Sequence, residues 1–474
     1  MTGRGRMAWR LAGVTVATLA LMAGCSTGAP APDRAAPGQG DGSATTAAPL
    51  PAAVTLPPAP SRRPATGLVG TVGSEPGAIS LARLDPATLQ PLAGPRVELE
   101  VNVAGWSVSP DRSLAAVGDG NGNGLVQVVD LGAMRSLGTV QVGAGSVTEA
   151  SAWLGPRRVA VVLGGMAGPT DGVEVVVIDP LARKVLARRS LAGQERAVGH
   201  LPGGLVLLLA PAQEIGPARL AVIAGRGAVR TVTLGRVAAG FKPPKVEGAD
   251  AVGHQRGAGL AVDPDGRRAF VVAPGAPVAE VGLDGLGVAD HTLDRPASPL
   301  ARLRQWLLPA AEAKAVSGPW RQASWVGGGL LAVASGEQRV AHDAKGALVQ
   351  RDLLSGVELV DTSRWRGWDL RARASRVDSQ GGRLLLSGGT WASDATSSTP
   401  RGVGLTVYGP GDRRPVHLLG RQFVQGVTVR GDLAYVWRTR ERDSGWAVVD
   451  LRTGRTLHTG DGDPTILLLG AAGW

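Results

Sequence analysis

The residue best placed to do chemistry is Cys25, the single cysteine of this 474-residue chain. It follows an apolar run of 14 residues that ends in Met22-Ala23-Gly24, and arginines stand ahead of that run. A positive start, a short apolar run and small residues before a processing point predict an export signal. The run is too short to cross a bilayer comfortably. An ordinary signal peptide and an uncleaved anchor remain the alternatives.

This junction resembles the lipobox of bacterial lipoproteins, in which small residues precede an obligatory cysteine. Met22 departs from the usual leucine. The resemblance implies that residues 1–24 are a lipoprotein signal peptide and that Cys25 carries the lipid, such as palmitate. It further implies attachment to the cell membrane on its extracytoplasmic face. Because no second cysteine exists, disulfides and thiolate metal sites are excluded.

Other groups that carry chemistry are sparse. The sequence has no HExxH helix, no GxSxG elbow and no P-loop. The glycine-rich stretches at 118–124 and 460–464 have the residues of hairpin turns rather than of a complete calcium loop. No catalytic residue, metal ligand or cofactor is therefore assigned, although histidines from distant segments can still meet in space. The six histidines are scattered: His200, His254, His291, His342, His417 and His458.

The elements that must position any site come from a repeat. A strand–turn–strand phrase such as "LAVDPDGRRAFVV" alternates with one such as "VQVVDLGAMRSLGTVQV". Each pair predicts a four-stranded antiparallel unit of about 40 residues, the period of propeller blades. The second phrase places an aspartate where its side chain can cap a turn, namely Asp85, Asp130, Asp179, Asp361 and Asp450.

The ends of the repeat predict ring closure. "GLVGTVG" matches the second strand of a blade, and "PTILLLGA" supplies the missing first strand. The pattern resembles β-propellers with YVTN-type repeats, shared by quinoprotein-like propellers. The fold class expected is all-β: a propeller of four-stranded antiparallel blades, eight by count with seven as the alternative, closed by the C-terminal strand.

Composition sets the other boundaries. Residues 25–65 are rich in Pro, Ala and Gly and predict a disordered tether, whereas residues 66–474 form the propeller domain. The net charge is +11, but the arginines are spread along the chain and often stand at turns. That spread argues against nucleic-acid binding.

Three insertions interrupt the repeat, at 235–256, 295–320 and 338–355. The first predicts a loop, the second contains a helix that starts at Ser298 and stops at Pro309, and the third lengthens a hairpin. Trp306 lies on the apolar face of that helix. Tryptophans in or near these loops are candidate ligand contacts, with packing between blades as the alternative. The candidates are Trp306, Trp365, Trp368 and Trp391.

Three functions remain open at this point. The one favoured is a lipid-anchored envelope protein whose propeller binds a protein or cell-wall ligand. The second is an envelope enzyme, either a quinoprotein-like oxidoreductase or a hydrolase, with a site in the central channel. The third is a structural part of a larger envelope complex. Fold alone does not decide among them.

Overall fold

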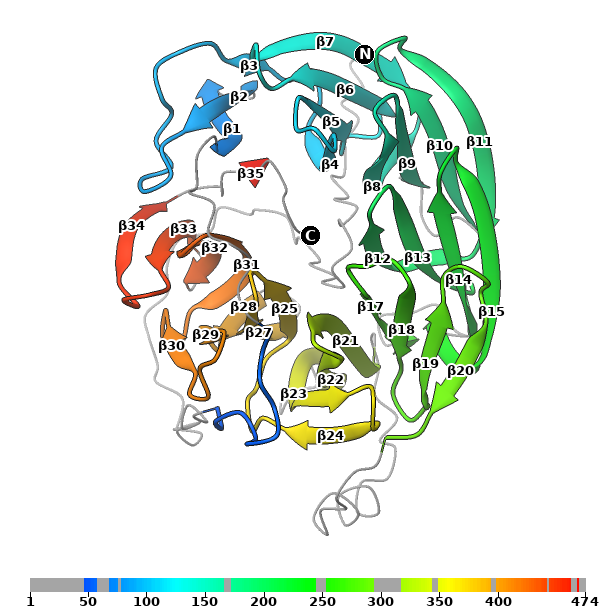
Figure 1. Ribbon diagram of the computed structural model, residues 1–474, viewed down its shortest axis with the longest axis vertical. Coiled ribbons are helices and arrows are strands. Elements are labelled where there is room, and N and C mark those ends of the chain that lie inside the picture. Colours follow the sequence, from blue (N-terminus) through cyan, green and yellow to red (C-terminus); the bar gives the residue numbers. More distant parts are fainter. Residues whose placement is uncertain are drawn as a thin grey trace, which may run out of the picture.

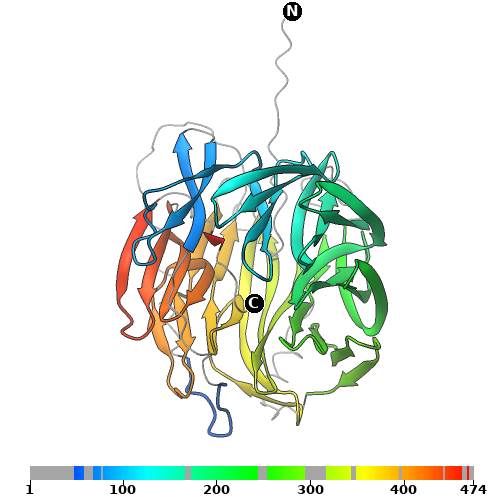
Figure 2. The same ribbon diagram turned by 45° about the horizontal axis from the view of Figure 1, so that its top comes forward.

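The structure is a computed structural model and describes residues 47–57, 68–75, 78–165, 172–243, 253–293, 317–342, 348–393, 398–440, 443–461 and 467–468. These residues form eight antiparallel sheets arranged around one axis (Figures 1 and 2). The chain is an eight-bladed β-propeller, which confirms the predicted fold class and the count of eight. No helix occurs within the ranges just given.

The blades are numbered from β1, and their strands are named from the axis outward. Blade 1 contains β35 (Leu467–Leu468), β1 (Leu68–Glu75), β2 (Ala78–Leu84) and β3 (Val97–Glu98). Blade 2 contains β4 (Val103–Val108), β5 (Leu114–Asp119), β6 (Leu125–Asp130) and β7 (Arg135–Gln141). Blade 3 contains β8 (Ser146–Gly155), β9 (Arg158–Gly165), β10 (Gly172–Asp179) and β11 (Lys184–Ala192). Blade 4 contains β12 (Gln194–Leu201), β13 (Gly204–Ala210), β14 (Ile215–Ala224) and β15 (Ala228–Lys242), with β16 (His254–Arg256) paired to β15.

Blade 5 contains β17 (Gly259–Val262), β18 (Arg268–Val272), β19 (Val278–Gly282) and β20 (Val288–His291). Blade 6 contains β21 (Gly318–Gly327), β22 (Leu330–His342), β23 (Leu348–Asp361) and β24 (Arg366–Asp369), and β27 (Gly389–Ser393) and β28 (Ser398–Gly402) extend its sheet. Blade 7 contains β25 (Arg376–Gln380), β26 (Arg383–Ser387), β29 (Leu405–Tyr408) and β30 (Val416–Leu418). Blade 8 contains β31 (Phe423–Arg430), β32 (Leu433–Arg440), β33 (Asp443–Asp450) and β34 (Thr456–Asp461).

The core is divided among the seams between neighbouring blades. Successive side chains of a strand point to opposite faces, so a strand between two seams must be apolar on both. In β13, Leu205, Leu207 and Leu209 pack in the seam with blade 3, whereas Val206 and Leu208 pack in the seam with blade 5. Eight such clusters occur, one in each seam. The unbroken apolar runs of the sequence are therefore the middle strands of blades.

The ring closes as the sequence predicts. Leu468 pairs with Val69 and Leu467 with Gly70, which makes β35 the innermost strand of blade 1. At the seam between blades 8 and 1, the hydroxyl of Tyr435 donates a 3.0 Å hydrogen bond to the carbonyl of Pro86. One strand from the end of the chain thus completes a blade begun by its start, and an open edge is removed.

The predicted aspartate caps are confirmed at the turns between third and fourth strands. The Oδ1 atom of Asp85 accepts hydrogen bonds from the Ala87 and Thr88 amides at 3.0 and 2.8 Å. Asp179 accepts from Leu181 and Ala182 in the same way, at 3.1 and 2.9 Å. Hydrogen bonds from Thr88 hold the pKa of Asp85 below its usual value. The repeat is therefore fixed by turn chemistry as well as by apolar periodicity.

Residues 47–57, which lie within the predicted tether, pack against the seam between blades 6 and 7. We call this segment the seam strap; it is drawn in dark blue beside β24 and β30 in Figure 1. Leu50, Val54 and Leu56 are only 2–3% exposed and belong to the cluster of that seam. Composition predicted disorder here, and the structure differs because the ring supplies an apolar cleft that few apolar side chains suffice to fill. The remainder of 25–65 is outside the described residues.

Hydrogen bonds anchor the seam strap at its outer end. The Ala48 amide donates to the Leu370 carbonyl, and the Leu50 amide donates to the Arg413 carbonyl, both at 2.8 Å. The Tyr408 hydroxyl donates to the Ala48 carbonyl at 2.8 Å, and burial raises the pKa of Tyr408. At the inner end, a Cβ placed on Gly327 would lie 2.8 Å from Cγ of Pro57. The strap therefore runs from the periphery of the ring toward the axis.

Candidate functional site: the insertion rim

The two rims of the ring differ in their connections. Neighbouring strands are antiparallel, so the turns after first and third strands share one rim, and the connections after second and fourth strands share the other. The first rim carries short turns. The second rim carries the long additions at 235–256, 338–355 and 389–402, and we call it the insertion rim. Long connections are where propellers place their binding surfaces, so this rim is the candidate site.

The described parts of these additions form strands. At 235–256, where a loop was predicted, β15 continues to Lys242 and pairs with β16. The prediction was wrong there because Val237 and Ala239 alternate toward a buried face. The predicted lengthening of a hairpin at 338–355 is confirmed by β22 and β23, which pair as far as His342 and Leu348.

These strands join blades that are otherwise separate sheets. β16 runs parallel to the start of β21, with the Gln255 amide donating to the Ser317 carbonyl at 2.8 Å. The Gly257 amide donates to the Pro319 carbonyl at 3.0 Å. At the other side, β23 pairs with β27 through Arg351 and Ala392. A continuous wall, β15–β16–β21–β22–β23–β27–β28, therefore connects blade 4 to blade 7 along the insertion rim.

A half-buried chain of polar side chains crosses this wall. The Gln255 side-chain amide donates to Oε1 of Gln338 at 2.8 Å, and the Gln338 amide donates to Oδ1 of Asp352 at 3.2 Å. The Trp391 backbone amide donates to Oδ2 of the same carboxyl at 3.1 Å. Burial raises the pKa of Asp352, and these two donors oppose the effect. The carboxyl links β22, β23 and β27, and Gln338 extends the chain to β16, which gives the wall a rigid rather than a loop-like surface.

The inner strands bring arginines from different repeats to the insertion rim. Each first strand starts at this rim, and arginine stands near that start in blades 4 to 7, at Arg196, Arg256, Arg321 and Arg376. Arg438 comes to the same rim at the end of β32, where it pairs with Val424. All are half-buried. In the sequence these arginines are scattered. The signal that could have predicted their common location is that each of the first four stands near the start of the first strand of a repeat.

Bulges at corresponding places help to aim these polar residues. The ladder of β12 skips Arg196, the ladder of β8 skips Glu149, and the ladder of β31 skips Gln425. A bulged residue is left out of the pairing and its side chain is re-aimed, which is common beside functional sites. The same device recurs in blades 3, 4 and 8, and in each it takes one polar side chain, Arg196 among them, out of the ladder of the inner strand.

Trp365 lies in the turn after β23, at the short-turn rim, with φ +53°. It stands four residues after Asp361, just as Met134 stands four residues after Asp130, and Met134 is buried in its seam. The Trp365 ring stacks on His291 with centroids 3.7 Å apart and a 9° interplanar angle. This contact packs blade 5 against blade 6.

The other candidate tryptophans lie apart from Trp365. Trp368 is in β24 and packs against the seam between blades 6 and 7, with the Arg366 guanidinium 5.7 Å from its ring centroid. Trp391 is in β27 and its ring lies 4.9 Å from that of Phe423. Trp391 is the member that the structure places on the insertion rim. The helix predicted from Ser298, Trp306 within it, and Cys25 lie outside the described residues.

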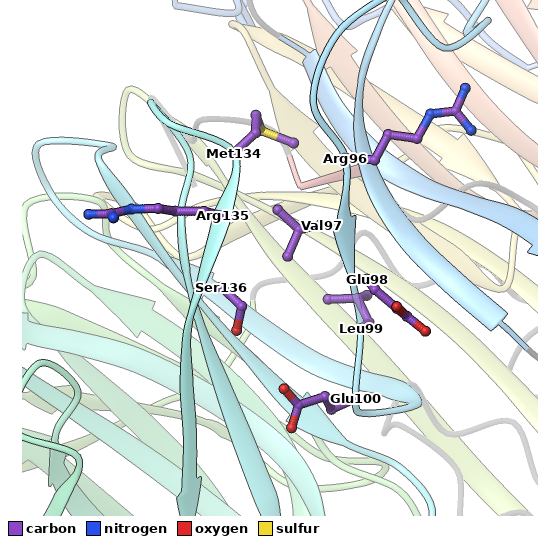
Figure 3. Close-up of a pocket in the computed structure, with 8 residues that line it drawn as sticks. All are labelled: Arg96, Val97, Glu98, Leu99, Glu100, Met134, Arg135 and Ser136. Carbon is purple, nitrogen blue, oxygen red and sulfur yellow. The ribbon is translucent and has the colours of Figure 1, made fainter.

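A recess of about 410 Å³ lies elsewhere, between β3 and β7 at the outer edges of blades 1 and 2 (Figure 3). Its floor is formed by Val97, Leu99 and Met134, which belong to the buried cluster of that seam. Arg96 and Arg135 extend away from each other on its two sides. The recess is thus a dimple over an ordinary seam, with no pair of groups converging on one point.

Among the residues that the structure describes, no group of three or more His, Cys, Asp and Glu side chains is placed to hold a metal ion. The same part of the chain contains no helix that is long and apolar enough to cross a membrane.

Comparison with known proteins adds no function. No protein-family model and no curated protein sequence matches the chain. The dihydro-heme d1 dehydrogenase NirN, in complex with DHE, is similar over 92% of this chain and 83% of its own, with 15% identity and a TM-score of 0.48. BamB from Moraxella catarrhalis is similar over 83% and 93%, with 11% identity and a TM-score of 0.40. A eukaryotic initiation factor is similar over 85% of this chain and 97% of its own, with 11% identity and a TM-score of 0.43. At these scores the likenesses carry no argument about what this chain binds or catalyses.

Proposed function

We propose that the protein is a lipid-anchored envelope protein whose propeller binds a partner through the insertion rim. The observation that carries the proposal is the wall from β15 to β28, a rigid surface built from additions that the blades themselves do not need. A propeller blade is complete with four strands, so strands added at one rim only are best explained by use of that rim.

The anchor belongs to the same proposal. The lipobox-like junction at residues 22–25 supports a lipid on Cys25, and the route of the seam strap supports an orientation. The strap enters at the outer end of the seam between blades 6 and 7, beside the short turn that contains Arg413. A chain anchored ahead of the strap leaves the insertion rim free for a partner.

The anchor is tested by replacing Cys25 with serine in cells that make the protein. We expect Cys25→Ser to move the protein from the membrane pellet to the soluble extracytoplasmic fraction, because one acyl-bearing residue supplies the attachment. Pelleting that survives a high-salt wash in the variant would refute the anchor.

Partner binding is tested by crosslinked co-purification of the full chain with a shortened rim. Residues 339–351 are replaced by Asn-Gly, which joins Gln338 directly to its ladder partner Asp352 in a two-residue hairpin. We expect the shortened variant to lose the crosslinked partner that the wild type retains. The control is Leu181→Ala with Lys184→Ala, two exposed residues of the opposite rim. Equal capture by the shortened variant and the wild type would refute the insertion rim as the binding surface.

A further inference from the structure

The arginines of the insertion rim are held in an unusual way. The Arg196 guanidinium donates from Nη2 to Oε1 of Gln194 at 2.9 Å, and the Arg438 guanidinium donates from Nη1 to Oε1 of Gln422 at 2.8 Å. Arg256 donates from Nη2 to the Pro274 carbonyl. A guanidinium has five N–H donors, so one hydrogen bond fixes the group and leaves most donors uncommitted.

The uncommitted donors include buried ones. Within the described ranges, the Nε atoms of Arg196, Arg256, Arg376 and Arg438 are buried and have no hydrogen-bond partner. Leaving a buried donor unpaired is costly, and the cost is larger for a charged group. Burial also lowers the pKa of Arg196, although nearby Glu195 opposes this. The same unfavourable arrangement at four places on one rim is evidence for a common use.

These arginines follow one another around the axis. Arg196 lies in β12 of blade 4, and Arg256 lies at the end of β16, just ahead of the first strand of blade 5. Arg321 lies in blade 6, Arg376 in blade 7 and Arg438 in blade 8. The Arg321 amide donates to the Gly257 carbonyl at 3.0 Å, which places it beside Arg256. The Val377 amide donates to Oε1 of Gln322 at 3.2 Å, which places Arg376 beside the next residue of β21. We call these five residues the arginine arc.

Acidic side chains near the arginine arc do not neutralise its positive charge. Glu149 of blade 3 and Glu195 of blade 4 lie near the starts of their inner strands, and Asp378 lies two residues beyond Arg376. Asp352 is linked through Gln338 to Gln255, the neighbour of Arg256. Burial raises the pKa of Asp378, while Arg376 lowers it. Even with all four carboxylates charged, the five arginines leave positive charge in excess.

We propose that the arginine arc binds a compact multivalent oxyanion, one that carries phosphate or carboxylate groups. Arginine presents parallel N–H donors that match the oxygens of such groups, and fixed guanidinium groups lose less entropy on binding than free ones. The inference rests on the proposed function only in that it assigns ligand chemistry to the same rim.

The test is isothermal titration of the full-length protein with pyrophosphate and, separately, citrate. We expect saturable binding of one or both, weakened about ten-fold or more in the variant Arg196→Gln with Arg376→Gln, since each charge-assisted contact is worth at least that factor. The matched control is Arg189→Gln with Arg226→Gln, which removes the same charge from exposed positions of blades 3 and 4. Binding by the control is expected to equal that of the wild type. Phosphate and carboxylate chemistry are distinguished by which anion binds more tightly.

A second variant keeps the test decisive if the glutamine pair fails to fold. Arg196→Lys with Arg376→Lys retains the charge but loses the planar donor pair, and we expect weaker binding in a protein with wild-type circular dichroism. The inference is overturned if neither anion binds the wild type, or if the folded arc variants bind as the control does. Because partner capture is measured with a different variant, either of these results leaves the proposed function standing.

Discussion

Replacing Leu50 with alanine should free the seam strap without unfolding the ring. Leu50 is 2% exposed, and removing a buried leucine side chain beyond Cβ costs about 2–5 kcal/mol. The strap can detach from the seam by itself, since among the described residues three hydrogen bonds join it to the ring, those with Leu370, Tyr408 and Arg413. The cost is therefore expected to appear as local opening of residues 47–57 rather than as global instability.

The magnitude can be measured by hydrogen exchange with mass spectrometry. A cost of about 2 kcal/mol raises the open population about 30-fold, because each 1.4 kcal/mol is a factor of ten. Exchange at the Ala48 and Leu50 amide positions should accelerate by that factor or more, while the amides of β13 keep their wild-type rates. Leu181→Ala is the control, since Leu181 is 48% exposed. The reasoning fails if Leu50→Ala and Leu181→Ala exchange equally over 47–57.

Three further predictions address other parts of the ring. Burial lowers the pKa of His200 from 6.5 to about 4, so the unfolded chain binds more protons between these values and the free energy of unfolding should fall as pH drops from 6.5 toward 4. Urea titrations at a series of pH values should show this fall in the wild type, with a total change in the free energy of unfolding of about 3 kcal/mol at most. The fall should be absent in His200→Gln. Truncation after Asp461 removes β35 and should lower the melting temperature; an unchanged melting temperature would mean that the ends are not joined through β1. Trp365→Ala removes the stack on His291 and should lower the free energy of unfolding by about 1–3 kcal/mol, with no effect on anion or partner binding. A loss of binding in a stable Trp365→Ala protein would restore this residue as a ligand contact.

The fold could be predicted from the sequence because its determinants are local. Each aspartate cap and each apolar alternation lies within one or two strands, so Asp85 and the run of β13 could be recognised without the rest of the ring. The closing strand was predicted for a related reason, since a missing first strand can be identified by counting.

The site depends on distances that a single repeat does not contain. Arg196 and Arg376 are 180 residues apart in the sequence, and only the closed ring of blades brings their strands around one axis. The wall was hidden similarly, because β16 pairs with its own blade and also lies beside β21 of another. The seam strap was missed because four apolar residues among prolines are too few to order themselves, and their partner cleft belongs to blades made of residues 326–408.

The seam strap also determines the path that a mechanical load takes through the molecule. With the proposed anchor on Cys25 and the proposed partner on the insertion rim, tension between the two would reach residues 47–57 before it reached β1. There it is resisted by amide hydrogen bonds and by side chains wedged between two blades. β1 meets β35 through two residue pairs, Val69 with Leu468 and Gly70 with Leu467. Under that proposal the strap protects the closure of the ring, because a pull that would separate β1 from β35 is transferred to the seam between blades 6 and 7 instead.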